Sequence, residues 1–150
     1  MAVNTALGPY ALATDDGERL RFGDVEILLK ATAATTGGAF TLFEERDPAD
    51  TPLHVHERED ELFYVLEGEH VFQVGDEELG AGPGDLVFAP RGVPHAQRRV
   101  VPRTGRVLVL TAPAGLEGFF RDLARAATAG ELGPEAYARA SARHGIGWLD

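Results

Sequence analysis

Residues 54–68 read HVHEREDELFYVLEG, in which two closely spaced histidines precede a run of acidic and then apolar residues. His54 and His56 stand two positions apart in an extended segment, where side chains alternate between the two faces of a strand. Both imidazoles therefore project from one face, about 7 Å apart along the strand, while Val55 projects from the other. A polar loop follows, and the apolar run within Glu61–Leu66 then predicts a second strand that ends before a glycine.

The region from about residue 20 to residue 112 continues in the same way, with short apolar or alternating runs between turn residues. Residues 82–84 (GPG) and 90–92 (PRG) are examples of the intervening clusters, which are typical of turns. The predicted strands are Val25–Ala31, Phe40–Glu44, Leu53–His56, Glu61–Leu66, His70–Val74, Leu86–Ala89, Ala96–Val101 and Arg106–Thr111. About eight short strands at this spacing predict an all-β sandwich or barrel. Residues 1–18 show no period and predict an irregular arm.

Beyond residue 112 the apolar period changes to that of an α-helix. Apolar side chains recur at helical spacing at Leu116, Phe119, Phe120, Leu123, Ala124 and Ala127. Pro134 suits the first turn of a second helix, which we expect to reach about Arg143 and to end at Gly145. We expect both helices to pack their apolar faces on the outside of the barrel or on a second subunit. No boundary is visible, so we predict one domain over residues 1–150, with a barrel core at about 20–112 and a helical extension at about 115–145.

Composition narrows the functional classes. The 150 residues carry a formal net charge of −10, and the 14 basic residues form no cluster, so we expect no nucleic-acid partner. The chain has no cysteine, which excludes disulfides and thiolate metal sites and is typical of a cytoplasmic protein. No apolar run reaches the length of a membrane span, and residues 1–17 show no signal-peptide pattern, so we expect no contact with a membrane.

Three of the five histidines and one carboxylate can meet around a single cation. His54 and His56 share a strand face, Glu61 opens the next predicted strand, and His95 follows a Gly-Val-Pro turn where another strand begins. Imidazole nitrogen and carboxylate oxygen suit Fe, Mn, Co, Ni, Cu or Zn rather than calcium. The alternative is a metal-free remnant in which these side chains hold the barrel together by hydrogen bonds. We prefer the metal, because burying three histidines without a cation is costly.

Two stretches resemble the two motifs of the cupin superfamily. Residues 54–68 follow the first motif, H-x-H, four residues, E, six residues, G. Residues 84–95 read GDLVFAPRGVPH and follow the second motif, G, five residues, P-x-G, two residues, H. The resemblance covers about residues 40–112 and implies an antiparallel jelly-roll barrel, the double-stranded β-helix, in a small cupin similar to quercetin dioxygenases. It also implies a homodimer and one divalent transition metal held by His54, His56, Glu61 and His95.

Two positions depart from the family pattern. The glycine that often begins the first motif is Pro48 here, and the asparagine that often closes the second is Arg99. Neither position is a metal ligand in the family, so the departures leave the implied site complete. Arg99 lies an even number of residues after His95, so we expect it to share a strand face with that histidine and to alter the pocket.

The expected function follows from the ligand count. Four protein ligands leave one or two positions open on a metal that prefers five or six, and open positions are typical of catalytic sites. We expect a metal-dependent dioxygenase that acts on a small oxygen-rich or aromatic metabolite, with Glu61 as a base. The alternatives are a redox-neutral metal enzyme, such as an isomerase or a polyketide cyclase, and a non-catalytic cupin that binds a small molecule. The candidates for an apolar pocket wall are Phe40, Leu42, Phe63, Phe72 and Phe88.

Other polar side chains near the motifs have simpler interpretations. The motif spacing selects Glu61, so Glu59 and Asp60 are interpreted as solvated loop charges. His70 and His144 have no partner at ligand spacing and are interpreted as ordinary surface or packing residues.

Overall fold

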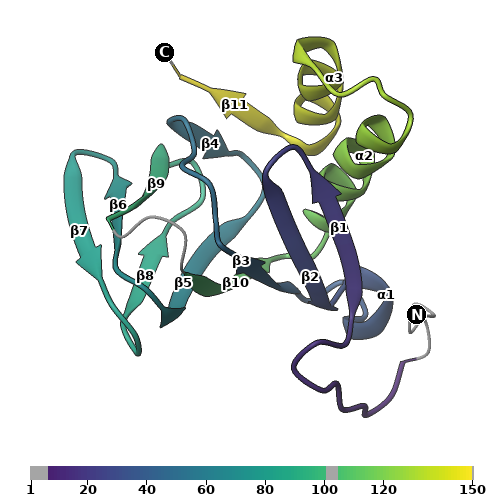
Figure 1. Cartoon of the computed structure of the whole chain (residues 1–150), viewed down its shortest axis with the longest axis horizontal. Coiled ribbons are helices and arrows are strands. Elements are labelled where there is room, and N and C mark those ends of the chain that lie inside the picture. The colour runs from purple at the N-terminus through teal and green to yellow at the C-terminus, as the bar shows by residue number, and fades with distance from the viewer. Residues whose placement is uncertain (1–6, 101–104, 150) are drawn as a thin grey trace.

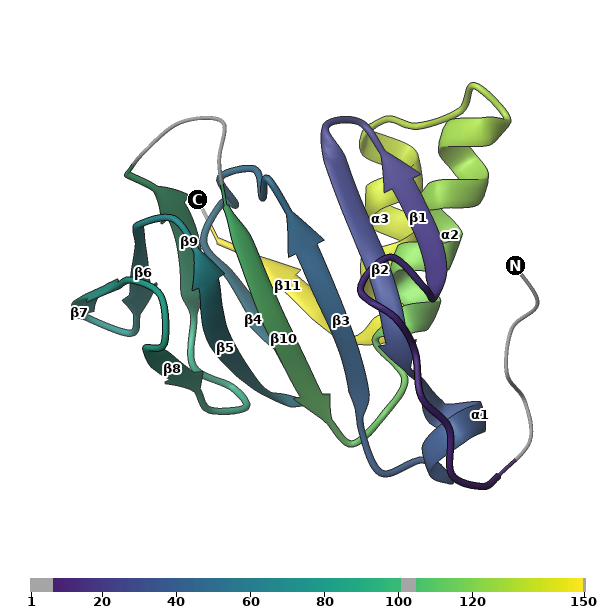
Figure 2. The same ribbon diagram turned by 60° about the horizontal axis from the view of Figure 1, so that its bottom comes forward.

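The chain forms two antiparallel β-sheets with helices at one end (Figures 1 and 2), and the computed structural model describes residues 7–100 and 105–149. The larger sheet has the order β1-β2-β3-β10-β5-β8, formed by Glu18–Phe22, Val25–Ala31, Thr41–Arg46, Arg106–Ala112, Asp60–Glu67 and Leu86–Ala89. The smaller sheet has the order β11-β4-β9-β6-β7, formed by Ile146–Trp148, His54–His56, His95–Arg99, His70–Val74 and Glu77–Ala81. Neighbouring strands are antiparallel, and the predicted all-β jelly roll with C-terminal helices is confirmed.

Two short hairpins extend the sheets beyond the predicted strands. Gly23 joins β1 to β2 and Gly75 joins β6 to β7, each in the left-handed region at φ 56° and 58° and each followed by an aspartate. Glycine adopts this backbone conformation without steric cost, which suits a two-residue turn. The sequence did not predict β1 and β7, because both strands are rich in charged residues or glycine.

The core lies between the sheets and follows strand alternation. On β5, Phe63 and Val65 point inward and are buried, whereas Tyr64 between them is exposed. On β10, Val107 and Val109 point inward in the same way. A period of two therefore assigns one face of each strand to the core.

In the described part of the chain three helices accompany the sheets: α1 (Ala33–Thr36), α2 (Glu117–Thr128) and α3 (Pro134–His144). Pro134 and Gly145 bound α3 as the sequence predicts, and Gly145 is left-handed at φ 70°. Among the described residues, no helix combines the length and the apolar character that crossing a lipid bilayer requires.

The predicted position of the helices on the outer surface is wrong. Figures 1 and 2 show α2 and α3 together at the β1–β2 end of the larger sheet. The Phe120 ring stacks on Phe22 at 6.1 Å and meets Phe43 edge-on at 4.9 Å, between ring centroids. Both partners belong to the buried core, so the apolar face of α2 closes the interior of the fold instead of covering its outside.

A buried carboxylate fixes where α2 begins. Glu117 in the first turn accepts hydrogen bonds from the backbone N–H of Ala33 at 2.8 Å and of Gly115 at 3.0 Å, and from the Thr41 hydroxyl. A negative charge also suits the positive end of a helix dipole. These contacts tie α2 to α1 and β3 and so position the helix over the interior.

Candidate metal centre

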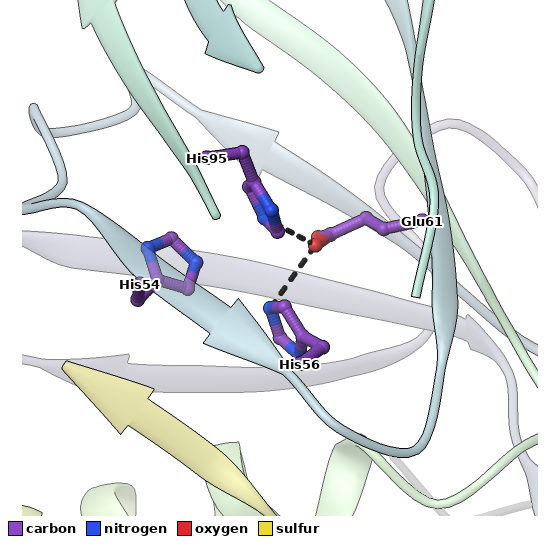
Figure 3. A group of neighbouring side chains, drawn as sticks. All are labelled: His54, His56, Glu61 and His95. Carbon is purple, nitrogen blue, oxygen red and sulfur yellow. Dashed lines mark hydrogen bonds and ion pairs between the residues drawn. The ribbon is translucent and has the colours of Figure 1, made fainter. Parts of the chain in front are cut away.

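The structure brings His54, His56, Glu61 and His95 together from three strands (Figure 3). His54 and His56 project from the same face of β4, and His54 lies opposite His95 of β9 in register. Glu61 reaches the group from β5 of the other sheet. One nitrogen or oxygen atom from each side chain lies within 4.8 Å of the others. This set of atoms could hold one metal ion.

The Glu61 carboxylate is the centre of the group. Its Oε2 lies 3.1 Å from His56 Nε2 and 2.9 Å from His95 Nε2 (dashed lines in Figure 3). Burial opposes ionisation of Glu61, but the charge and hydrogen bond of His56, together with the His95 contact, outweigh it and hold its pKa well below its usual range. Burial also lowers the pKa of His56, but the Glu61 and Glu59 carboxylates reverse this and raise it to about 10. The pocket thus balances one carboxylate with a positive charge.

Backbone carbonyls orient the other two imidazoles. His54 Nδ1 lies 2.8 Å from the Pro52 carbonyl oxygen, and His95 Nδ1 lies 3.3 Å from the Val93 carbonyl oxygen. A carbonyl only accepts, so each Nδ1 carries a hydrogen. The His54 ring can therefore present its Nε2 lone pair to the group, whereas His95 Nε2 donates to the Glu61 carboxylate at 2.9 Å. Burial, with the nearby His95 next in importance, lowers the pKa of His54 to about 4, which favours its neutral form. This is the form in which imidazole binds metals.

The interpretation of Glu59 as a solvated charge is wrong. Glu59 is 4% exposed, and its Oε1 lies 3.5 Å from His56 Nδ1. Both atoms are buried without a hydrogen-bond partner among the described residues. A cation on His56 Nε2 would place the proton of that ring on Nδ1, facing Glu59, and such carboxylate–histidine pairs orient metal ligands. Asp60 is only half-buried, and it accepts a hydrogen bond from the Arg91 backbone N–H at 2.9 Å.

A cavity of about 170 Å³ adjoins the four side chains. Its walls are mainly apolar and aromatic and come from both sheets, both C-terminal helices and β11: Phe22, Ile27, Phe43, Phe63, Leu116, Phe119, Phe120, Tyr137, Ile146 and Trp148. Of the predicted wall residues, only Phe63 lines this cavity. Phe72 is buried behind it, at 4.7 Å between ring centroids, and Phe88 is exposed. Phe40 and Leu42 lie in a separate depression beneath the N-terminal arm.

Three residues of this site have no counterpart in the sequence predictions. Trp148 of β11 pairs with His54, and the two ring centroids lie 5.2 Å apart. The Trp148 indole N–H donates to the Ser141 hydroxyl at 2.8 Å, which fixes the ring. Glu45 of β3 and Gln97 of β9 also line the cavity. Strand alternation places Gln97 on the His95 face, so the spacing of these two residues was an available signal for it.

The remaining predicted polar residues lie away from the group. His70 is buried, and its Nε2 lies 3.0 Å from the Glu67 carbonyl oxygen. His144 bonds to Asp122 at 2.9 Å, on the helices. Both therefore have the packing roles that the sequence indicated. The Arg99 side chain lies outside the described residues, as does Val101 of the strand predicted there.

Comparison with known proteins agrees with the two motifs. A cupin domain family model matches residues 43–111. Quercetin 2,3-dioxygenase of Bacillus subtilis is 33% identical over 117 residues, which is 77% of this chain and 34% of that protein. The chain therefore spans about a third of the length of this curated relative.

Solved structures share the fold. KdgF from a Halomonas species superposes with a TM-score of 0.63 at 18% identity, over 73% of this chain and 98% of that one. A RmlC-like cupin from Shewanella frigidimarina superposes with a TM-score of 0.62 at 18% identity, over 73% of this chain and 96% of that one. At these identities the likeness concerns the fold alone. The match over residues 43–111 and the related dioxygenase sequence identify a cupin domain in this chain, and the solved structures agree with it in fold.

Proposed function

We propose that this cupin is a metal-dependent enzyme of the dioxygenase type, with one divalent transition metal held by His54, His56, Glu61 and His95. The observation that carries the proposal is the convergence of three imidazoles and one carboxylate, each within 4.8 Å of the others, beside a cavity. The orientation of His54 and His95 by carbonyls and the buried Glu59 behind His56 support it, because each prepares a ring nitrogen for a cation. The identity of the metal stays a matter for measurement.

The side chains supply the rest of the chemistry. A divalent metal with open coordination positions contributes Lewis acidity and, for iron, manganese, nickel or copper, a site for redox chemistry. Glu61 is buried beside the cavity, and its carboxylate, once released from the metal, would be placed to accept a proton from a substrate hydroxyl. The aromatic walls exclude water from the bound substrate and favour a flat ring.

The proposed reaction is the insertion of both atoms of O₂ into a small oxygen-rich or aromatic compound. Both oxygen atoms enter the product, so the reaction balances without an external reductant. The sequence relationship to a quercetin 2,3-dioxygenase supports this reaction class.

The test is oxygen uptake by protein loaded in turn with iron, manganese, nickel or copper, against a panel of catechols and flavonols. Metal-dependent uptake with one of these compounds is the expected result. Turnover without oxygen uptake would instead identify a redox-neutral enzyme, and saturable binding without turnover under every metal would identify a small-molecule-binding cupin.

Removal of the Glu59 carboxylate is expected to weaken the metal site without emptying it. Glu59→Leu leaves all four ligands in place but removes the carboxylate that lies 3.5 Å from His56 Nδ1. Loss of such an orienting partner lowers metal affinity by about 10- to 100-fold. Competition titration with a chromophoric zinc chelator measures the change, and Glu57→Leu, on an exposed residue of the same loop, is the control. Equal affinities in the two variants would contradict the role of Glu59.

The homodimer is a proposal supported by the outer face of the larger sheet. Tyr64, Leu86 and Phe88 are exposed there, and the register places Tyr64 beside Leu86 and Leu62 beside Phe88. An exposed apolar patch of this kind is typical of a protein interface. Sedimentation of the wild type as a monomer would contradict the proposed dimer.

The cytoplasmic location stays a prediction from the sequence.

A further inference from the structure

Glu45 and Gln97 line the cavity outside the four-residue group, and neither side chain has a hydrogen-bond partner among the described residues. Within residues 7–100 and 105–149 no hydrogen bond or ion pair involves the carboxyl of Glu45, a partly buried residue that lines the cavity. Gln97 is 4% exposed and lines the same cavity, and its amide Nε2 is buried without a partner. Buried polar groups are nearly always hydrogen-bonded, so an unpaired one beside a cavity points to a ligand that completes it.

Glu45 lies in a row of apolar side chains. In register across the larger sheet it stands between Ile27 of β2 and Val107 of β10, which are both buried. On its own strand it shares the inward face with Phe43. Burial, with a contribution from the Glu61 charge, raises the pKa of Glu45 to about 8. A carboxyl group in this position costs stability, and an apolar residue would pack better.

Gln97 faces the cavity from the smaller sheet. Its backbone is fixed by two hydrogen bonds to Thr51, because the Gln97 N–H donates to the Thr51 hydroxyl and the Thr51 N–H donates to the Gln97 carbonyl, each at 2.9 Å. Its register partner on β6 is the fully buried Phe72. The amide is therefore held on a rigid strand two residues beyond His95, which suits a specificity contact.

The size of the cavity limits the ligand. A dry apolar cavity of roughly 150 Å³ holds a single benzene ring, and the cavity here is about 170 Å³. A three-ring flavonol exceeds that space, whereas one substituted ring fits between walls such as Phe43, Phe63 and Phe119.

We infer that Glu45 and Gln97 form a polar anchor for a single-ring substrate. The adjacent oxygens of this substrate face the His54–His56–Glu61–His95 group, and a third oxygen accepts hydrogen bonds from the anchor. The inference rests on the proposed function and adds the substrate class to it. A neutral Glu45 carboxyl and the Gln97 amide are both donors, so a carbonyl or hydroxyl oxygen suits them.

The test compares two ligands in one spectroscopic titration. Cobalt-loaded protein is titrated with 3,4-dihydroxybenzaldehyde, which carries a third oxygen, and with 4-methylcatechol, which carries a methyl group in its place. The cobalt absorption bands report binding without turnover. The ratio of the two dissociation constants is compared between proteins, so the different acidities of the two catechols cancel.

The wild type is expected to prefer the aldehyde, and Gln97→Leu and Glu45→Leu are each expected to reduce that preference by about 10-fold, as befits one lost hydrogen bond. Glu45→Leu is also expected to raise the melting temperature while cobalt content stays unchanged, a combination that a purely structural Glu45 would not produce. Matched controls are Gln73→Leu on β6 and Glu77→Leu on β7, which lie outside the cavity and are expected to keep the wild-type ratio. Gln97→Met and Glu45→Met, which also remove the donor, replace any leucine variant that fails to fold.

The outcomes distinguish failure of the proposed function from failure of the polar anchor. If neither catechol changes the cobalt spectrum of the wild type, both the proposed function and the polar anchor are contradicted. If both bind but the ratio is the same in wild type and variants, the anchor alone is overturned. Tighter binding of quercetin than of either catechol would overturn the single-ring substrate class.

Discussion

His56→Ala is expected to lose its metal and, with it, all metal-dependent turnover. The substitution removes the nitrogen that lies 3.1 Å from Glu61 Oε2, and it leaves both Glu59 and Glu61 buried without that imidazole. Loss of an orienting partner alone costs about 10- to 100-fold in metal affinity. Loss of a direct ligand is expected to exceed the upper end of that range.

Metal content after purification, measured by plasma mass spectrometry, and a zinc competition titration test this expectation. His144→Ala is the matched control, since His144 bonds to Asp122 on the helices and lies outside the cavity. The control is expected to keep its metal. Full occupancy in His56→Ala would remove the basis for the proposed centre, whatever activity the protein shows.

Leu123→Ala is expected to lower the free energy of unfolding by about 3 kcal/mol, within the usual 2–5 kcal/mol for a buried leucine. Leu123 of α2 is completely buried and belongs to the main core cluster together with Phe119 and Leu116. Truncation leaves a void where α2 meets the core, and α2 also carries a wall of the cavity. The variant is therefore expected to bind small ligands more weakly as well as to unfold more easily.

Urea unfolding followed by tryptophan fluorescence measures the stability, because Trp148 is the only tryptophan and lies beside the cavity. Arg125→Ala, on an exposed position of the same helix, is the control and is expected to change stability by less than about 0.5 kcal/mol. A loss below about 1 kcal/mol in Leu123→Ala would show that α2 does not pack as a part of the core.

The sequence predicts the four-residue group because the signal is local. The His54–His56 spacing and the two motifs fix strand faces within short segments, and β2, β6 and β8 have their predicted bounds. The sequence did not identify Glu45 as a cavity residue, because the strand was expected to end at Glu44, whereas β3 continues to Arg46. With the strand extended, alternation from Phe43 would have placed Glu45 inside.

Other features depend on contacts between distant segments. The helical period of α2 identifies its apolar face, but the partner of that face is the interior near Phe22 and Phe43, which precede Phe120 of this helix by 98 and 77 residues. Trp148 reaches His54 only because β11 adds to the edge of the smaller sheet beside β4. Glu59 is buried by its neighbours in space, although its sequence context of charged residues is typical of an exposed loop.

The junction between β4 and β9 consists of a single register pair, His54 with His95, whereas β6 and β9 share five. Few backbone hydrogen bonds therefore connect the edge formed by β4 and β11 to the rest of the smaller sheet. An ion held jointly by these two histidines would act as a cross-link between neighbouring strands, in the manner of a disulfide. The amides of β4 would then exchange their hydrogens more slowly in the loaded protein, so cation uptake and the local rigidity of this edge would rise together.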